Sequence, residues 1–214
     1  MAPTNEEKHQ ETYAAAEVAV RGHDPLEIAR RAGARWVPAA EGEGVLELAA
    51  LGSTVRVAWP TLVFEGPPAL ANNFAWRLIA LHYLAMATGR TPGMDWVSYR
   101  ELPDGLFYAN TITREVEEPL ARLFATDPGA FAAAGGPLGA SSADIADASL
   151  VFLPLPHVPV VFALWVEDEE FPAKMKVLYE REGTANLPLQ DLRILADMLG
   201  AALRREDAAA RPDG

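Results

Sequence analysis

The segment LVFLPLPHVPVVFALWVEDEEFPAKMKVLY, residues 150–179, carries the pattern that decides the fold. It contains three apolar runs rich in β-branched and aromatic residues, which are typical of strands: Leu150–Leu155, Val158–Val166 and Met175–Tyr179. Prolines and one acidic turn separate the runs, and strands that follow each other closely in sequence usually pair. This segment therefore predicts an antiparallel sheet in the last third of the chain.

Further elements follow on both sides of this segment. Val45–Leu51 and Thr54–Trp59 flank Gly52-Ser53, a pattern typical of a β-hairpin. Periodic apolar positions and capping residues predict helices over 5–20, from Asp24 to Gly33, from Asn72 or Asn73 through Thr88, and over 107–125, with a kink or break at Pro119. After Pro188 one amphipathic helix is expected, with its apolar face formed by Leu192, Leu195, Ala196, Leu199 and Leu203.

Helices and hairpins occur in blocks instead of strict β-α-β alternation, which favours the α+β class. We therefore expect a mainly antiparallel sheet with helices packed on it, in a single domain over residues 1–204. Residues 5–33 would form a helical N-terminal layer. Residues 205–214 have the polar, alanine-rich composition of a disordered tail.

Composition excludes several function classes. The chain has 214 residues, half of them hydrophobic, which suffices for a large core. It has no cysteine, so disulfides, thiolate nucleophiles and cysteine-ligated metal clusters are excluded. The formal net charge of −12 would repel a nucleic-acid backbone, so we expect no nucleic-acid partner. A reducing compartment agrees with the lack of cysteine.

No segment has the pattern of a signal peptide or a membrane helix. The first dozen residues are polar and charged, and the most apolar stretch, 150–166, is interrupted by Pro154, Pro156 and Pro159. We therefore expect a cytoplasmic protein without a membrane partner.

The acidic run Glu167-Asp168-Glu169-Glu170 is the first candidate for chemistry. Carboxylates at the end of a strand could hold magnesium or calcium, or act as a general base. Neighbouring strand side chains point to opposite faces, however, so the four cannot converge. Asp168 is the candidate that we retain. For the run as a whole, the structural alternative of a solvated turn is favoured.

Lys174 and Lys176 share one face of the next strand by the two-residue period. One of them could pair with Asp168 or hold an anionic ligand. The structural alternative is a strand whose lysines discourage edge-to-edge aggregation.

Trp96, Tyr99 and Arg100 form an aromatic and basic cluster, and Trp165 precedes the acidic turn. An arginine flanked by aromatic rings can bind a carboxylate or phosphate while the rings stack on a planar group. The structural alternative is a core tryptophan beside an arginine ion pair.

No residue pattern indicates a metal or a cofactor. His82 and His157 could be ligands, but neither is accompanied by a second histidine at metal spacing. No serine elbow and no phosphate-binding glycine loop are present. We therefore assign no metal site, and the cofactor stays unknown.

The chain resembles a family of uncharacterised bacterial and archaeal proteins, a domain of unknown function, over about residues 72–203. The resemblance rests on WVSYRELP (96–103), on Pro159-Val160 and Leu164-Trp165, on DEEFPA (168–173) with KVLY (176–179), and on LPLQDL (187–192). It implies that some relatives are fused to cysteine-rich iron–sulfur modules. This chain has no cysteine, so any such connection would require a separate partner. The resemblance implies no catalytic residue.

Three functional hypotheses remain. The first is an accessory protein that binds a small planar or anionic molecule, with Trp96, Tyr99, Arg100 and Trp165 as ligand-binding residues and Lys176 as a further positive charge. The second is an enzyme with Asp168 as general acid or base and Lys174 or Lys176 as electrostatic partner. The third is a protein-interaction module that uses the amphipathic C-terminal helix. The two matched segments, 96–103 and 165–176, must meet in space for the first hypothesis to hold as stated.

Overall fold

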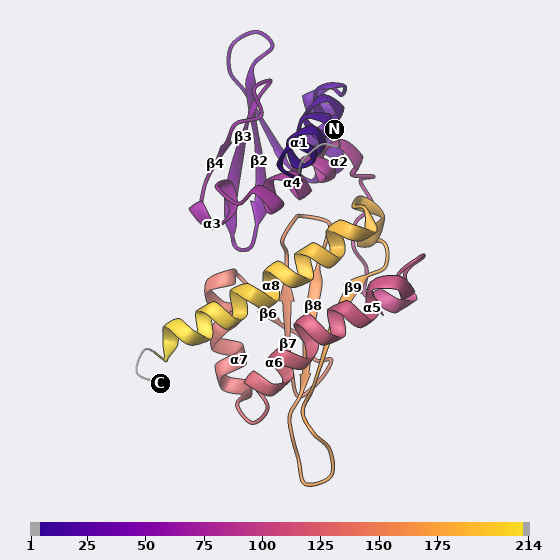
Figure 1. Ribbon diagram of the computed structural model, residues 1–214. Coiled ribbons are helices and arrows are strands. Elements are labelled where there is room, and N and C mark those ends of the chain that lie inside the picture. Colours follow the sequence, from indigo (N-terminus) through magenta and orange to yellow (C-terminus); the bar gives the residue numbers. More distant parts are fainter. Residues whose placement is uncertain (1–4, 212–214) are drawn as a thin grey trace.

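The computed structural model describes residues 5–211 and has two lobes, each built from one antiparallel sheet and several helices (Figure 1). The α+β class is therefore confirmed, with the strands divided between two sheets. A continuous cluster of buried apolar residues runs through both lobes.

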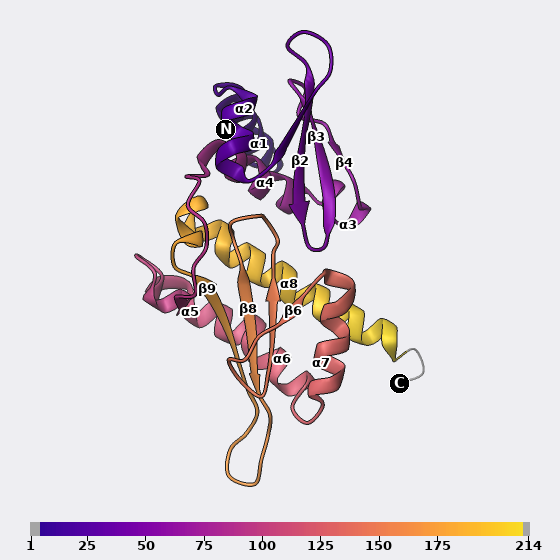
Figure 2. The same ribbon diagram turned by 180° about the vertical axis from the view of Figure 1, so that it is seen from behind.

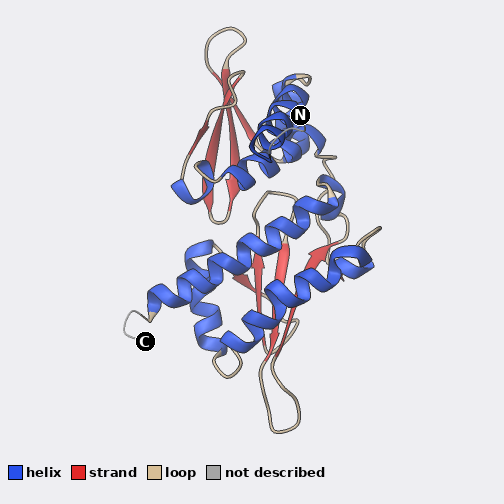
Figure 3. Ribbon diagram, viewed as in Figure 1, coloured by secondary structure: helices blue, strands red, loops and turns tan. Residues whose placement is uncertain are grey.

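The N-terminal lobe comprises residues 5–86. Its four-stranded sheet has the order β1-β2-β3-β4, and its helices lie beside this sheet (Figure 3). The elements are α1 (Asn5–Arg21), α2 (Pro25–Ala32), β1 (Arg35–Pro38), β2 (Gly44–Ala50), β3 (Ser53–Trp59), β4 (Phe64–Glu65), α3 (Pro68–Ala71) and α4 (Phe74–Met86).

Local sequence signals set the boundaries of these elements. The Asp24 carboxylate caps α2 by accepting from the backbone N–H groups of Leu26 and Glu27, and the Asn73 side chain caps α4 in the same way. The predicted hairpin is confirmed, with Leu51 and Gly52 at its turn. Both have positive φ, 48° and 70°, as a tight turn between two twisted strands requires.

The C-terminal lobe comprises residues 96–211. Its five-stranded sheet has the order β5-β9-β8-β7-β6, and α6 and α8 lie over one face, behind the strands in Figure 2. The elements are β5 (Trp96–Ser98), η1 (Tyr99–Glu101), α5 (Leu106–Ile112), η2 (Thr113–Glu117), α6 (Glu118–Leu123), α7 (Pro128–Gly135), η3 (Gly136–Leu138), β6 (Ser141–Ser142), β7 (Ala148–Phe152), β8 (Val160–Trp165), β9 (Lys174–Glu180), η4 (Gly183–Asn186) and α8 (Leu189–Ala210).

The three strands predicted over 150–179 are β7, β8 and β9, and they pair in sequence order. The expected amphipathic helix is α8, whose five predicted apolar positions are all buried. Pro119 does not break the helix around it. Instead the backbone widens to a π-helical turn, η2, in which the N–H of Glu118 bonds to the carbonyl of Thr113. The wider turn accommodates a residue that has no N–H to donate.

Helix α8 continues to Ala210, through most of the segment 205–214 whose composition predicts disorder. The Arg211 side chain bonds to Asp207 at 3.1 Å and to Asp127 at 3.2 Å, which ties the end of α8 to the start of α7. Residues 212–214 lie outside the described residues. Within residues 5–211, no helix combines the length and the apolar character that crossing a membrane requires.

The two lobes meet along α8 and at the β2–β3 turn. The backbone N–H of Leu51 donates to the carbonyl of Leu153 at 2.8 Å. Gly52 and Gly139 touch backbone to backbone: a Cβ on Gly139 would lie 2.5 Å from the Gly52 nitrogen. Farther along, Nδ1 of His82 on α4 lies 2.7 Å from Oδ2 of Asp191 on α8.

We expect Gly139→Ala to destabilise the protein by about 1–3 kcal/mol, because the new methyl group would collide with Gly52 at a positive φ of 68°. Urea unfolding followed by circular dichroism measures this change. Gly136→Ala is the matched control, since a Cβ there has open space and φ is −54°. Equal stability of the two variants would contradict the proposed contact.

Candidate functional site

The β8–β9 hairpin places Trp165 directly opposite Lys174. The Lys174 Nζ atom lies 5.5 Å from the centroid of the Trp165 ring, within the range of a cation–π contact. Trp165 is partly exposed. This tryptophan therefore has an intramolecular cation on its face, in the place where the sequence predicted a stacked ligand.

Asp168 lies in the long loop that joins β8 to β9, at the bottom of Figure 1. Its Oδ1 atom accepts hydrogen bonds from the backbone N–H groups of Glu170 and Phe171 at 2.8 and 2.7 Å. These bonds form an Asx turn within an exposed loop. The carboxylate thus stabilises its own loop, and it does not converge with Lys174 and Lys176 on a common cavity.

Lys176 pairs with Glu117, a residue that no sequence pattern indicated. Its Nζ atom lies 2.7 Å from Glu117 Oε2, and the Glu117 side chain is only 7% exposed. The same carboxylate accepts from Thr113 Oγ1 at 2.8 Å and from the backbone N–H of Val177 at 3.1 Å. Three donors thus bind this buried carboxylate, which is carried by the π-helical turn η2.

The predicted cluster of Trp96, Tyr99 and Arg100 does not surround a common space. Tyr99 is buried, and its hydroxyl donates to the carbonyl of Leu189 at 3.0 Å. Arg100 is exposed and donates to Asn110 Oδ1 at 2.8 Å. Trp96 lies on β5, opposite Glu180 of β9. Tyr99 is thus a core residue that packs against Tyr179 and bonds to α8. The predicted alternative, a core tryptophan beside an arginine ion pair, does not describe this cluster either, because Trp96 is half-buried and Arg100 bonds to an amide.

The two matched segments border the same strand but lie near its opposite ends. Trp165 pairs with Lys174, and Trp96 pairs with Glu180, six residues farther along β9. At about 3.3 Å per residue, this separation is about 20 Å. The structure therefore does not bring the predicted aromatic, basic and acidic residues together into one site.

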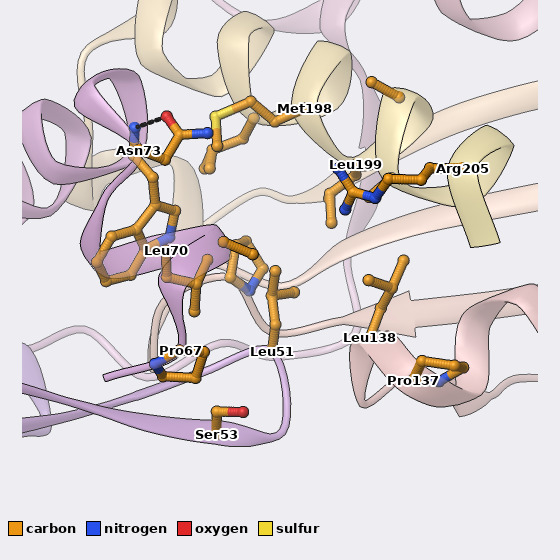
Figure 4. Close-up of a pocket in the computed structure, with 16 residues that line it drawn as sticks. Leu51, Ser53, Pro67, Leu70, Asn73, Pro137, Leu138, Met198, Leu199 and Arg205 are labelled. Carbon is orange, nitrogen blue, oxygen red and sulfur yellow. Dashed lines mark hydrogen bonds between the residues drawn. The ribbon is translucent and has the colours of Figure 1, made fainter. Parts of the chain in front are cut away.

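A pocket between the two lobes, which we call the interlobe pocket, is a concave site that lies apart from these predicted residues (Figure 4). It has a volume of about 240 Å³. Its walls come from the β2–β3 turn, from α3 and the start of α4, from η3 and from the middle of α8. The lining is mostly aliphatic and includes Leu51, Pro67, Leu70, Pro137, Leu138, Leu195, Met198 and Leu199.

Few polar groups face this apolar pocket. Trp76 is 1% exposed, and its indole Nε1–H has no acceptor among the described residues. The Oδ1 atom of Asn73 accepts a hydrogen bond from the backbone N–H of Trp76 at 3.1 Å. The amide nitrogen of Asn73 faces Met198 in Figure 4. Arg205 stands at the edge, where its guanidinium extends toward Leu199. Its ion pair with Glu206 is long, 3.8 Å, so it keeps free donors for a ligand.

Sequence patterns could not find this pocket, because its residues come from five separate segments and have core-like identities. The one sequence feature that could have indicated the pocket was Trp76, in the helix that begins after Asn73. No group of three or more histidine, aspartate or glutamate side chains suited to a metal occurs within residues 5–211. The exposed large apolar side chains among these residues include none on α8, whose apolar face is buried in the protein itself.

We expect Tyr99→Phe to cost about 1 kcal/mol, because the Leu189 carbonyl loses its buried partner. Burial raises the pKa of Tyr99 to about 12 from its usual 10. The phenolate is thus disfavoured in the folded state, so this residue's contribution to stability is complete below pH 10 and is lost as the pH rises toward 12. Urea unfolding at several pH values tests both points. Tyr108→Phe, at an exposed hydroxyl, is the control.

Removing the Glu117 carboxylate leaves Lys176, Thr113 and the Val177 N–H without their acceptor. We expect Glu117→Ala to destabilise the protein by about 2–4 kcal/mol. Glu118→Ala, one residue on and largely exposed, should change stability by less than about 0.5 kcal/mol. Thermal and urea unfolding provide the comparison, and similar values for both variants would show that the buried network contributes little.

Comparison with known proteins confirms the family resemblance. A family model described as a domain of unknown function, DUF3786, matches residues 24–202. No curated protein and no solved structure matches the chain. The matched range includes most of both lobes and most of the interlobe pocket, and this chain belongs to the DUF3786 family.

Proposed function

We propose that this protein binds a small, mainly apolar molecule in the interlobe pocket. The ligand would place a hydrogen-bond acceptor at Trp76 Nε1 and an anionic group at Arg205. The observation that carries this proposal is the side chain of Trp76, which lines the pocket and whose buried indole N–H has no acceptor among the described residues. A buried donor without a partner costs about 1–3 kcal/mol, and a ligand acceptor would recover this free energy.

The character of the lining supports the same ligand class. Ligand pockets are typically apolar, with a few convergent polar groups that orient the bound molecule. The volume of about 240 Å³ suits a compact molecule of one or two rings. Met198 adds an adaptable side chain that can adjust to the shape of a ligand. This proposal keeps the predicted planar or anionic ligand but assigns it to other residues.

The acid–base alternative has less support from the geometry. It requires Asp168 and a lysine to face one cavity, but Asp168 bonds to its own loop while Lys176 bonds to Glu117. The protein-interaction alternative relied on an exposed apolar face of α8, and the residues of that face are buried. Ligand binding between the lobes is therefore the function that we favour.

The proposal is tested with 2-naphthoate, a planar apolar anion, by isothermal titration calorimetry. We expect saturable one-to-one binding. Trp76→Phe, which removes the N–H but keeps an aromatic ring, should weaken it about tenfold, the equivalent of about 1.4 kcal/mol. Arg205→Gln should weaken binding of 2-naphthoate but leave the neutral 2-naphthamide unaffected.

A steric variant separates the pocket from other surfaces. Ala201 is exposed yet lines the pocket, so Ala201→Trp should fill it and abolish binding without unfolding the protein. Ala208→Trp, at an exposed position on the same helix outside the pocket, is the control and should bind as the unmodified protein does. Unchanged affinity in Ala201→Trp would refute binding at this site.

A further inference from the structure

A second concave site, which we call the lysine groove, lies between the start of β9 and the helical segment η2–α6. It is an open groove of about 410 Å³ and is separate from the interlobe pocket. The lysine groove and the interlobe pocket share no lining residue. Its lining consists of Thr113, Glu117, Glu118, Ala121, Arg122, Pro172, Ala173, Lys174, Met175 and Lys176.

The groove gathers an unusual share of the chain's lysines. The sequence contains three lysines, Lys8, Lys174 and Lys176, whereas its other 15 basic residues are arginines. Two of the three therefore line this groove, and Arg122 lines it as well. The lining also includes Glu117 and Glu118, so its three cations and two carboxylates leave a formal charge of +1 in a protein whose net charge is −12.

The buried carboxylate of Glu117 holds one of these cations in place. It takes one hydrogen bond from the Lys176 ammonium and is otherwise occupied by Thr113 Oγ1 and the Val177 N–H. An ammonium group has three donors, so Lys176 keeps two for other partners. Its side chain is 32% exposed. Glu117 thus positions the lysine without using up its capacity to donate.

The other two cations are weakly engaged. Lys174 contacts the Trp165 ring, and within residues 5–211 no carboxylate forms an ion pair with it. Arg122 forms a long, exposed ion pair with Glu118, at 3.8 Å. Glu118 also lines the groove and is the one acidic side chain there with an exposed carboxylate. The two lysines line the groove from β9 and Arg122 lines it from α6, so cations from two elements border one groove.

We propose that the lysine groove binds the phosphate group of a small phosphorylated compound, held by Lys174, Lys176 and Arg122. Lysine ammonium groups act as compact point-charge donors to phosphate, and an arginine adds a planar pair of donors. The two lysines are separated by one residue on one face of β9, so their Cα atoms lie about 7 Å apart. One phosphate or diphosphate can bridge such a pair.

Lysine acetylation tests this proposal on the full chain. The protein is treated with N-hydroxysuccinimidyl acetate with and without inorganic pyrophosphate, and the rate at each lysine is measured by mass spectrometry. We expect pyrophosphate to slow acetylation of Lys174 and Lys176 at least fivefold, an order-of-magnitude expectation for a mostly occupied site, while Lys8 reacts at the same rate. Sodium chloride at equal ionic strength should give no protection. Equal slowing at all three lysines, protection by sodium chloride, or no protection at all would overturn the proposal.

Calorimetry with pyrophosphate at low ionic strength provides the second measurement. We expect Lys174→Gln to weaken binding about tenfold, with circular dichroism confirming that the exposed substitution leaves the fold intact. Arg114→Gln is the charge-matched control, since Arg114 is exposed on η2 and does not line the groove. If both variants weakened pyrophosphate binding equally, the effect would come from net charge alone, and a specific site would be refuted. Because Ala201→Trp blocks the interlobe pocket only, it should leave pyrophosphate binding unchanged.

Discussion

The structure depends most on the burial of the apolar face of α8. This helix lies between α4 of the N-terminal lobe and the sheet of the C-terminal lobe, so its side chains belong to the core of both (Figure 1). Tyr99 and Tyr179 fix its position, because their hydroxyls donate to the carbonyls of Leu189 and Leu192 in its first two turns. Exposing α8 would therefore expose both lobes to water.

The interlobe pocket follows from how this helix is shared. Near its N-terminal end α8 is bound to α4 through Asp191 and His82, and beyond its middle the lobes are held by the close contact of Gly52 with Gly139. Between these two points the facing side chains do not fill the space. The remaining cavity is mainly apolar, because it is bounded by residues that elsewhere would form core, and its lining includes Trp76, whose indole N–H has no acceptor among the described residues.

The β8–β9 hairpin shows how one buried carboxylate can organise an edge of a sheet. Strand β5 is short and pairs only with residues 178–180 of β9, so the N–H of Val177 has no strand partner on that side. Glu117 supplies the acceptor from the π-helical turn and binds Lys176 at the same time. The edge is thereby closed by a helix, which is one of the ways in which proteins protect unpaired strands. The lysines remain at the surface beside it, where the lysine groove forms.

The sequence by itself determined the local elements. Capping residues at Asp24 and Asn73, the β2–β3 hairpin, the three strands over 150–179 and the apolar face of α8 follow from short-range periodicity and turn chemistry, which a single sequence displays directly. Only the tertiary structure decided which charges meet. Lys176 pairs with Glu117, 59 residues away, instead of Asp168, eight residues away, because antiparallel pairing and the π-helical turn bring the distant carboxylate to the strand edge. The interlobe pocket likewise depends on contacts between segments far apart in the chain, and such contacts leave no periodic signal in the sequence.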